Sequence, residues 1–469
     1  MEKIMKPRNL TILAVGVAAL ILIIGLFVLK IGVADNGQLQ TVLESMGLYD
    51  GQMSIGSGYY SNSFGVMGPN TSYSTANLAY DVGKIGVPKD GIVPVAIPAI
   101  VYSVLFLVGL FLILISSMGK YRWNNVLLAV LSVVMLADIG YISFFNTPYR
   151  EAAAFSYLIL TVGLFLVTIK RENIITLILL GVSGFLFAGS MLPAAYAGIV
   201  LGLFALRLTF LKKNLLWKII SIAVCVVTVF SGVYTITTTD NSVNLYNSVF
   251  YGALKDSETV EEDLAELGLP AELKEYAGVP SFEEKAQEFI HSPEYKTQFL
   301  DRISYSKIAM FYVKNLGKFL NVEGLAANNS NFIRTSYLGN YAADSGKQPG
   351  EQAGFFSVYS WVKPKVVPAQ LYVLFGIFIL MILLSIQYRN KFTASPKDKI
   401  YCEFMAIGGL VAIFMLNLPV ILYGMSEISF HMFLYNAVTD LCVLAMIVGG
   451  TRMLTIRRDK LKETYGVNQ

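Results

Sequence analysis

The sequence has few charged residues and very few histidines and cysteines. Only 14% of its 469 residues are charged, and it contains two histidines and three cysteines. A soluble domain carries about 25% charged residues, so the low charge excludes an ordinary soluble protein. His291 and His431 are too few for a metal site built from several histidines. Cys225, Cys402 and Cys442 each lie in an apolar run, which excludes a disulfide framework and the cysteine spacing of a zinc site.

Apolar residues are abundant, at 55% of the chain, and the mean hydropathy is +0.58. A helix needs about 20 apolar residues to cross about 30 Å of hydrocarbon. Runs that meet or approach this length lie near 9–33, 93–117, 126–145, 152–169, 174–191, 193–211, 216–237, 366–387, 401–423 and 430–450. The sequence therefore predicts an all-α polytopic membrane protein with about 10 transmembrane helices. Only a few residues separate 174–191 from 193–211. Either two helices meet at a very short turn, or one of the two is short and tilted.

Basic residues gather at alternate ends of the predicted helices. The clusters are Lys3, Lys6 and Arg8; Lys120 and Arg122; Lys170 and Arg171; Arg207, Lys212, Lys213 and Lys218; Arg389, Lys391, Lys397 and Lys399; and Arg452, Arg457, Arg458, Lys460 and Lys462. Ten spans place all six clusters on one side, which the positive-inside rule makes cytoplasmic. We therefore predict a multi-pass protein of the plasma membrane with both termini in the cytoplasm. The net charge of +4 comes with these clusters, so we expect no nucleic-acid partner.

Two long segments fall on the other, extracytoplasmic side of the predicted topology. They are the first outer loop at 34–92 and a mainly helical loop domain at 238–365. The loop domain separates an N-terminal transmembrane module, 1–237, from a C-terminal transmembrane module, 366–469. Within the loop domain, Ile303–Leu320 combines helically spaced apolar residues with three lysines, which predicts an amphipathic helix on the outer membrane surface.

Asp35 and Asn36 follow the first apolar run directly, at the predicted outer interface. A carboxylate there is half in water, so it can stay ionised while it faces a lipid headgroup. This environment suits a general base that acts on a membrane-borne substrate. Asp-Asn-Gly is also ordinary turn chemistry, so a structural role stays open.

The short outer turn before 152–169 holds Tyr149, Arg150 and Glu151. Such crowding of chemically active side chains is unusual for a simple connector. Glu151 has two structural alternatives, because it can pair with Arg150 or cap the next helix at its positive end. A role in substrate binding and a role in capping both stay open.

The last two predicted helices are joined by an outer turn that contains Glu427 and His431. Asp440, in the last helix, and Asp138, in the third, fall within the predicted hydrocarbon. Ionisable residues at that depth need a buried partner or a neutral state, and by default they suggest function. Structural pairing is the alternative.

Arg334 and the run Leu338–Tyr341, which includes Asn340, lie in the loop domain. An arginine can hold a phosphate through its forked donors, although a loop arginine is usually just solvated. These candidates all lie on the predicted outer side, and the cytoplasmic loops carry no nucleotide-binding motif. Because nucleotide sugars and ATP are absent outside the cell, an activated donor would have to be carried by lipid.

Four stretches, taken in order, resemble a known family. They are Asp35–Gly37 with Met46–Tyr49, Phe145–Glu151, Leu245–Leu254 followed by Leu267–Pro270, and Leu338–Tyr341. The chain resembles the polytopic C-type (GT-C) glycosyltransferases of bacteria, particularly hexose transferases of S-layer and cell-surface glycans (WsfD type). The segment around Glu427, His431, Asn436 and Asp440 also resembles related transferases. Each motif is weak alone, and their order and topology make the set more specific.

The resemblance implies that a hexose moves from a polyprenyl-phosphate donor to a surface glycan or wall polymer, usually without a nucleotide. No cofactor is expected, and the absence of a clustered carboxylate pair in the sequence argues against a metal. It implies that Asp35 is the base or positions the acceptor, and that Glu151, the acidic residue of the second outer turn, is a second catalytic residue. Cationic side chains such as Arg334 or Lys314 would stabilise the leaving phosphate. The other expected contacts are Asn36, Tyr149, Arg150, Asn340, Glu427 and His431. Expected partners are the bilayer, a donor-making glycosyltransferase and a flippase.

The chain departs from the family pattern at two places. Many relatives have Asn-Gly-Asp in the first outer loop, whereas Gln38 stands in the third position here, and Phe430 replaces a frequent basic residue. Two other function classes therefore stay open. A transporter or flippase for lipid-linked sugars would place charges near the midplane in repeated halves. A non-catalytic scaffold that binds glycan is favoured by Gln38.

Overall fold

We describe the protein from a computed structural model. The structure describes residues 6–51, 58–392 and 395–465. Of the predicted basic clusters, Lys3 and the side chains of Lys391, Lys460 and Lys462 lie outside the described part.

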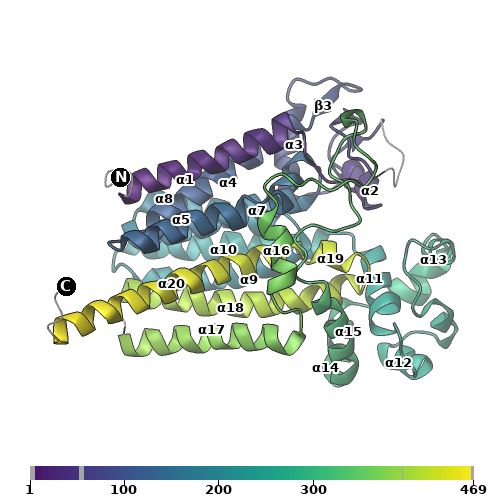
Figure 1. Cartoon of the computed structure of the whole chain (residues 1–469). Helices are drawn as coiled ribbons and strands as arrows, with labels where there is room; N and C mark the ends of the chain where they lie inside the picture. The colour runs from purple at the N-terminus through teal and green to yellow at the C-terminus, as the bar shows by residue number, and fades with distance from the viewer. Residues whose placement is uncertain (1–5, 52–57, 393–394, 466–469) are drawn as a thin grey trace.

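Long helices lie side by side and form a bundle (Figure 1). They are α1 (Pro7–Leu22, continued by the π-helical η1, Ile23–Val28), α4 (Ala96–Ser117), α5 (Arg122–Leu136), α7 (Arg150–Arg171), α8 (Ile174–Ala188), α9 (Leu192–Ala205, continued by η4, Leu206–Phe210), α10 (Leu215–Thr238), α17 (Leu371–Phe392), α18 (Pro396–Tyr423) and α20 (Phe433–Tyr465). Within the described ranges, eight spans are long and apolar enough to cross a membrane. This result confirms an all-α polytopic membrane protein.

The third predicted span is broken. The chain bends by 44° between α5 and a second piece, Ile139–Asn146, which consists of α6 (Ile139–Ile142) and the 3-10 turn η3 (Ser143–Asn146). Asp138 lies at the bend, and its side chain caps α6 by accepting a hydrogen bond from the Gly140 N–H at 2.8 Å. If the bent pair is taken as one span, the described residues contain up to nine candidate spans.

The fifth predicted span is a short helix. With 15 residues, α8 is about 22 Å long, compared with about 30 Å of hydrocarbon. It is followed at once by α9, so the chain makes two helices at a tight turn in this region. Gly198 of α9 permits the close return, because a Cβ atom there would lie 2.5 Å from the Cβ of Ala188.

α7 is the central helix of the bundle. Most of its residues are buried, whereas the other spans expose more of their surface. It packs closely on α4, where a Cβ atom on Gly163 would lie 2.6 Å from the carbonyl oxygen of Gly109. Small residues allow such close approach between membrane helices. The first residues of α7 are Arg150 and Glu151, so these two side chains start from the middle of the bundle.

A small sheet and two short helices follow α1 at one end of the bundle. The strands β1 (Leu48–Tyr49), β2 (Ser63–Val66) and β3 (Ile92–Pro94) form an antiparallel sheet in that order, and the helices are α2 (Leu39–Ser45) and α3 (Leu78–Lys84). Leu48 pairs with Val66, and Phe64 pairs with Val93. The alternation of apolar residues in β2 buries Phe64 and Val66 against the bundle.

The large loop between α10 and α17 is also helical. Its helices are α11 (Ser242–Ser248), α12 (Val260–Leu267), α13 (Glu284–Ile290), α14 (Tyr305–Lys314), α15 (Leu316–Asn328) and α16 (Val358–Val366). The predicted amphipathic helix is divided at Asn315 into α14 and α15. Both helices, and α16, run across the ends of the long helices rather than along them (Figure 1).

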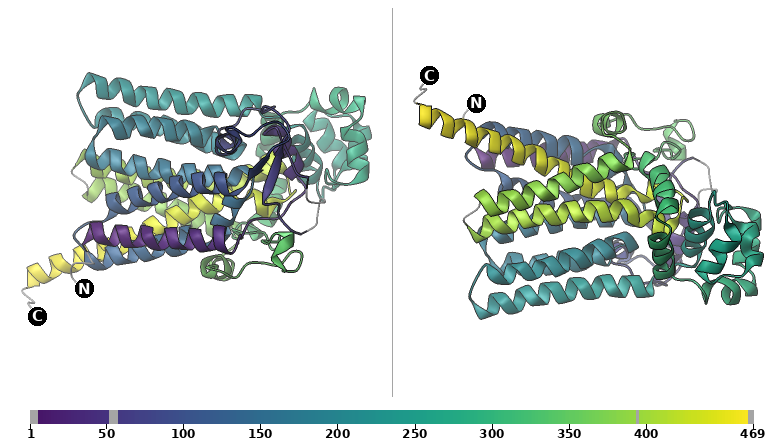
Figure 2. Two further views of the ribbon diagram at one scale, coloured as in Figure 1. Left: turned by 90° about the horizontal axis from the view of Figure 1, so that it is seen from above. Right: turned by 90° about the horizontal axis from the view of Figure 1, so that it is seen from below.

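The sheet and the large loop lie at the same end of the bundle, which we call the loop end. α1 begins and α20 finishes at the opposite end (Figures 1 and 2). The fold therefore separates the loops from the termini, as the predicted topology requires. The side of the membrane that each end faces stays a prediction.

Candidate functional site at the loop end

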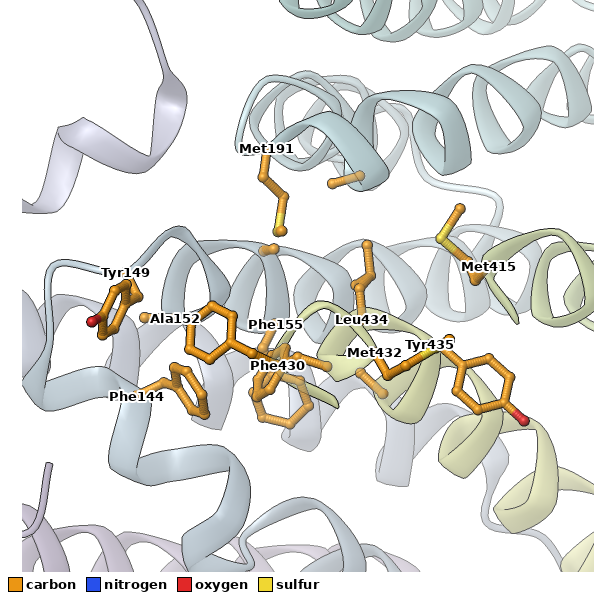
Figure 3. Close-up of a cluster of buried hydrophobic side chains, with 14 of the residues drawn as sticks. Phe144, Tyr149, Ala152, Phe155, Met191, Met415, Phe430, Met432, Leu434 and Tyr435 are labelled. Carbon is orange, nitrogen blue, oxygen red and sulfur yellow. The ribbon is translucent and has the colours of Figure 1, made fainter. Parts of the chain in front are cut away.

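Tyr149, immediately before α7, is the centre of a group of polar residues. Its hydroxyl donates to Asn36 Oδ1 at 2.9 Å and accepts the Asn36 N–H at 3.0 Å. Its buried ring packs edge-on against Phe144 and Phe430, and its hydroxyl points away from this aromatic cluster (Figure 3). The predicted residues Asn36 and Tyr149, 113 positions apart, are therefore in contact.

Three carboxylates surround Tyr149. Burial raises the pKa of Tyr149 well above its ordinary value, the hydrogen bond with the Asn36 backbone opposes this rise, and the charges of Asp35, Glu151 and Glu427 add to it. The three carboxylates come from the segment after α1, the first turn of α7 and the segment between α18 and α20. The structure thus brings the predicted acidic residues together at one place.

Asp35 both holds its turn and keeps an oxygen free. Its Oδ1 accepts the N–H groups of Gly37 at 2.7 Å and Leu39 at 3.2 Å. Gly37 has a φ of +89°, which only glycine adopts readily. The turn role considered from the sequence is present. Among the described residues no hydrogen bond reaches Oδ2 of the partly exposed Asp35, so this oxygen can accept a further hydrogen bond.

Glu427 stands in a strained backbone conformation, with a φ of +47°. Its backbone carbonyl accepts the N–H groups of Phe430 and His431, which starts the short helix α19 (Ile428–His431). Its carboxylate accepts the hydroxyl of Tyr337. Burial raises the pKa of Glu427, and the bond from Tyr337 opposes that rise. Left-handed residues other than glycine are costly and gather at functional sites, so this geometry fits a site residue.

Arg150 forms no ion pair with the residues that the structure describes, although the charge of Glu151 lies within electrostatic reach. Its Nε is buried and has no hydrogen-bond partner, and the described part of the chain shows no ion pair for its guanidinium group. The pair with Glu151 that the sequence allowed is not formed within 4.0 Å. Glu151 is buried in the first turn of α7, where the helix dipole favours a negative charge.

His431 is a neutral, buried side chain. Its ring lies flat on the ring of Tyr423, with centroids 3.7 Å apart and an angle of 9°, and it meets Phe430 edge-on. Burial lowers the pKa of His431 to about 3. The imidazole is therefore uncharged at physiological pH and can offer one donor and one acceptor.

Arg334 and Asn340 bind each other and hold the loop. An Nη atom of Arg334 donates to Asn340 Oδ1 at 3.0 Å and to the Ala353 carbonyl at 2.8 Å. Asn340 Nδ2 donates to the Gly32 carbonyl at 2.6 Å, and the Asn340 carbonyl accepts the Gly32 N–H at 2.9 Å. These bonds fasten the Leu338–Tyr341 run to the end of the first span, which is a structural role.

Lys314 lies apart from this group. It projects from α14, its side chain is 60% exposed, and it pairs with Glu266 at 3.4 Å. α14 and α2, which follows Asp35 closely, lie on opposite sides of the loop end (Figure 1). The structure does not bring Lys314 to Tyr149.

The two predicted intramembrane carboxylates, Asp440 and Asp138, both have polar partners inside the protein. Asp440 accepts the hydroxyls of Tyr141 and Tyr359 and forms an ion pair with Lys363 at 2.6 Å. Besides capping α6, Asp138 accepts the N–H of Ser360 at 3.1 Å. Their environments match the structural alternative.

Sequence analysis did not identify Lys363, Tyr337 or Tyr423. Asp440 in an apolar helix needs a cationic partner. Lys363, one turn after Tyr359 on α16, is such a cation, so the sequence contained a signal for the Lys363–Asp440 pair. Tyr423 closes the apolar run 401–423. A tyrosine there is typical of the aromatic belt at a membrane interface, so the sequence gives no sign that Tyr423 belongs to the site.

The group offers acid–base chemistry and an anion contact, with the predicted residues Asp35, Asn36, Tyr149, Arg150, Glu151, Glu427 and His431 around it. Within the described ranges, no set of three or more His, Cys, Asp or Glu side chains could hold a metal ion. An apolar cavity of about 30 Å³ lies elsewhere, among α7, α8, α9, α10 and α18. Its polar lining is limited to Thr161 and Thr228, and no acidic or basic side chain lines it.

A comparison with family models gives one finding. The model described as "YfdI N-terminal transmembrane domain" matches residues 1–466. The comparisons with curated proteins and with solved structures gave no significant match. The matched range includes every span and every candidate residue described above.

Proposed function

The chain belongs to the YfdI N-terminal transmembrane domain family, and on that premise we propose that it is a membrane glycosyltransferase. It moves a hexose from a polyprenyl-phosphate donor to a surface glycan or wall polymer on the extracytoplasmic face of the plasma membrane. Its GT-C character rests on the four resembling stretches. Its partners would be a donor-making glycosyltransferase and a flippase.

The gathering of three carboxylates and an unpaired arginine around Tyr149 carries the proposal. A carboxylate can take the proton of an acceptor hydroxyl, as a general base does. A fixed cation can stabilise the negative charge that develops on a leaving phosphate. The group lies at the end of the central helix of a membrane bundle, where a lipid-borne donor would present its headgroup.

The proposed reaction is a direct displacement. Oδ2 of Asp35 takes the proton of an acceptor hydroxyl while that oxygen attacks the anomeric carbon. The bond between the anomeric carbon and the phosphate oxygen breaks, the polyprenyl phosphate leaves as an anion, and the anomeric centre is inverted. Glu427 and the neutral His431 would orient sugar hydroxyls, and Arg334 and Asn340 would position the loop without touching the substrate.

A transfer assay tests the proposal. The purified chain in lipid nanodiscs would receive polyprenyl-phosphate hexose with a labelled sugar and an acceptor glycan from the producing cell. We expect labelled glycan to form with time and free polyprenyl phosphate to appear in equal amount. Movement of the lipid-linked sugar across vesicles without turnover would support a flippase instead, and binding alone would support a scaffold. In cells, we expect deletion of the protein to remove a hexose from the wall glycan.

A further inference from the structure

The guanidinium group of Arg150 lacks the anion that its environment demands. Arg150 is only partly exposed, and its Nε is buried without an acceptor. A buried charge is stable only when it is paired and hydrogen-bonded. Because the described residues supply no such partner, the missing acceptor points to a ligand.

The polar neighbours of Arg150 are also unengaged. Its charge lies within electrostatic reach of the Tyr423 hydroxyl at the end of α18 and of the Glu151 carboxylate, with which it forms no ion pair within 4.0 Å. Tyr423 in turn lies within reach of Glu151 and of Tyr196 on α9. His431 stacks on Tyr423. In the described part of the chain, no hydrogen bond is formed by the hydroxyls of Tyr196 and Tyr423 or by the ring nitrogens of His431. We call these four side chains the Arg150 cluster.

The charge of the Arg150 cluster selects the ligand. His431 is neutral because burial lowers its pKa to about 3, so Arg150 is the only cation among the four residues. Arg150 is the first residue of the 22-residue helix α7, whose dipole favours an anion at this end. A planar guanidinium matches two oxygens of a phosphate, and tyrosine hydroxyls can donate to the others.

We propose that the Arg150 cluster is the phosphate-binding part of the site and that Arg150 makes the main contact with the phosphate of a lipid-borne ligand. This inference rests on the proposed function and deepens it. It assigns the phosphate to Arg150 rather than to Arg334, one Nη of which is engaged by Asn340 and Ala353, or to Lys314, which pairs with Glu266.

Binding of a phosphate probe can be measured without turnover. The full chain in phosphatidylcholine nanodiscs would be titrated with farnesyl phosphate, with farnesol and with inorganic phosphate. We expect Arg150→Met to weaken binding of farnesyl phosphate about 10- to 100-fold, as the loss of a charge-assisted hydrogen bond does. Arg150→Lys should fall between wild type and Arg150→Met, because an ammonium cannot make the forked contact.

Lys314→Met is the matched control, since it also removes a cation from the loop end. It should change the affinity for farnesyl phosphate less than about twofold, because an exposed ion pair contributes little. Farnesol binding should be the same in all variants. Unchanged binding of farnesyl phosphate by Arg150→Met would overturn the inference, and so would an equal loss for farnesol. If inorganic phosphate binds as tightly as farnesyl phosphate, the lipid source is overturned and a free phosphate replaces it.

A stability measurement separates this role from a structural one. Removing a buried cation that lacks a partner should raise the melting temperature, so Arg150→Met should be at least as stable as wild type. A lower melting temperature with intact binding would assign Arg150 to the fold. Phosphate binding by a wild-type chain that shows no transfer would uphold the inference and reject the transferase. Normal transfer by Arg150→Met would uphold the transferase and reject the inference.

Discussion

Polar residues at the loop end differ in whether their side-chain atoms already have hydrogen-bond partners within the protein. Arg334, Asn340 and one oxygen of Asp35 are engaged in bonds that hold turns and loops. Arg150, Oδ2 of Asp35 and the Tyr423–His431 pair have polar atoms to spare. Because a buried polar group without a partner is costly, the spare atoms are the better guide to substrate contacts.

Asp35→Asn tests the proposed base. Asparagine keeps the Oδ1 acceptor for the N–H groups of Gly37 and Leu39, so the turn and the melting temperature should be preserved. Loss of the carboxylate should lower the transfer rate about 10²- to 10⁴-fold, the contribution typical of a general base. Initial rates and thermal unfolding of the purified variant would be compared with wild type. Near-normal transfer by a well-folded Asp35→Asn protein would remove Asp35 from the mechanism.

Glu323 of α15 should make stability depend on pH. Its side chain is fully buried and neither of its carboxylate oxygens has a partner in the described chain. Burial raises the pKa of Glu323 well above its ordinary value, and the facing titratable groups are Tyr312 and Tyr435. Because the folded-state pKa is raised, the contribution is fully present below the unfolded pKa of about 4.3 and is lost as pH rises through the folded-state pKa.

Glu323→Gln is the control for this pH dependence. Glutamine is uncharged at every pH, so the variant should exceed wild type in melting temperature at pH 8 and match it more closely at pH 5. Thermal unfolding in detergent between these pH values measures the difference. If both proteins show the same pH dependence, the buried carboxyl of Glu323 is not its source.

At the scale of elements, one loop helix is fixed to the bundle by a buried ion pair. Lys363 of α16 donates to Asp440 and Asn436 of α20. The side chains of Lys363 and Asp440 are only 3% and 2% exposed. Tyr359, one turn earlier on α16, donates to the same Asp440. The segment that carries Arg334 and Asn340 precedes α16, so this contact positions that loop over the first span.

Lys363→Met should destabilise the protein strongly. It leaves Asp440 buried without its cation, which costs about 3–5 kcal/mol when one partner of a buried pair is removed. Lys363→Met combined with Asp440→Leu should recover much of this loss, because no buried charge remains. Thermal unfolding of the single and double variants measures both effects. A double variant as unstable as the single one would show that the two residues do not act as a pair.

At the scale of the whole molecule, the loops and the termini lie at opposite ends (Figure 1). The end with the termini carries ion pairs between helical segments, where Glu403 of α18 meets Arg207 of η4 at 2.7 Å and Arg389 of α17 at 2.6 Å. The basic residues predicted to set the orientation therefore also join helices. The loop end carries the polar group around Tyr149.

Cysteine labelling tests the orientation. Cys225, Cys402 and Cys442 lie in spans, and none of the three is fully exposed. Lys274→Cys would place a thiol on the exposed surface of the large loop, and Lys213→Cys would place one on the exposed connector before α10. A membrane-impermeant maleimide should label the first in intact cells and the second only after permeabilisation. The reverse pattern would put the candidate site in the cytoplasm.

The sequence alone determined the helices and the predicted sidedness, because both depend on local properties. Apolar runs of sufficient length form spans, and charge clusters at alternate ends order them. It also pointed to Asp35, Glu151 and Glu427 as candidates. The bend at Asp138 and the break at Asn315 were not predicted, since packing and capping decide where a helix stops.

Only the tertiary structure decided which candidates meet and which are free. The contact of Asn36 with Tyr149 joins residues 113 positions apart, and that of Lys363 with Asp440 joins residues 77 apart. No sequence period encodes such pairings, because they arise when whole helices pack against one another. The same packing engages Arg334, whereas the similar side chain of Arg150 has no hydrogen-bond or ion-pair partner among the described residues, although both were candidates of equal chemistry in the sequence.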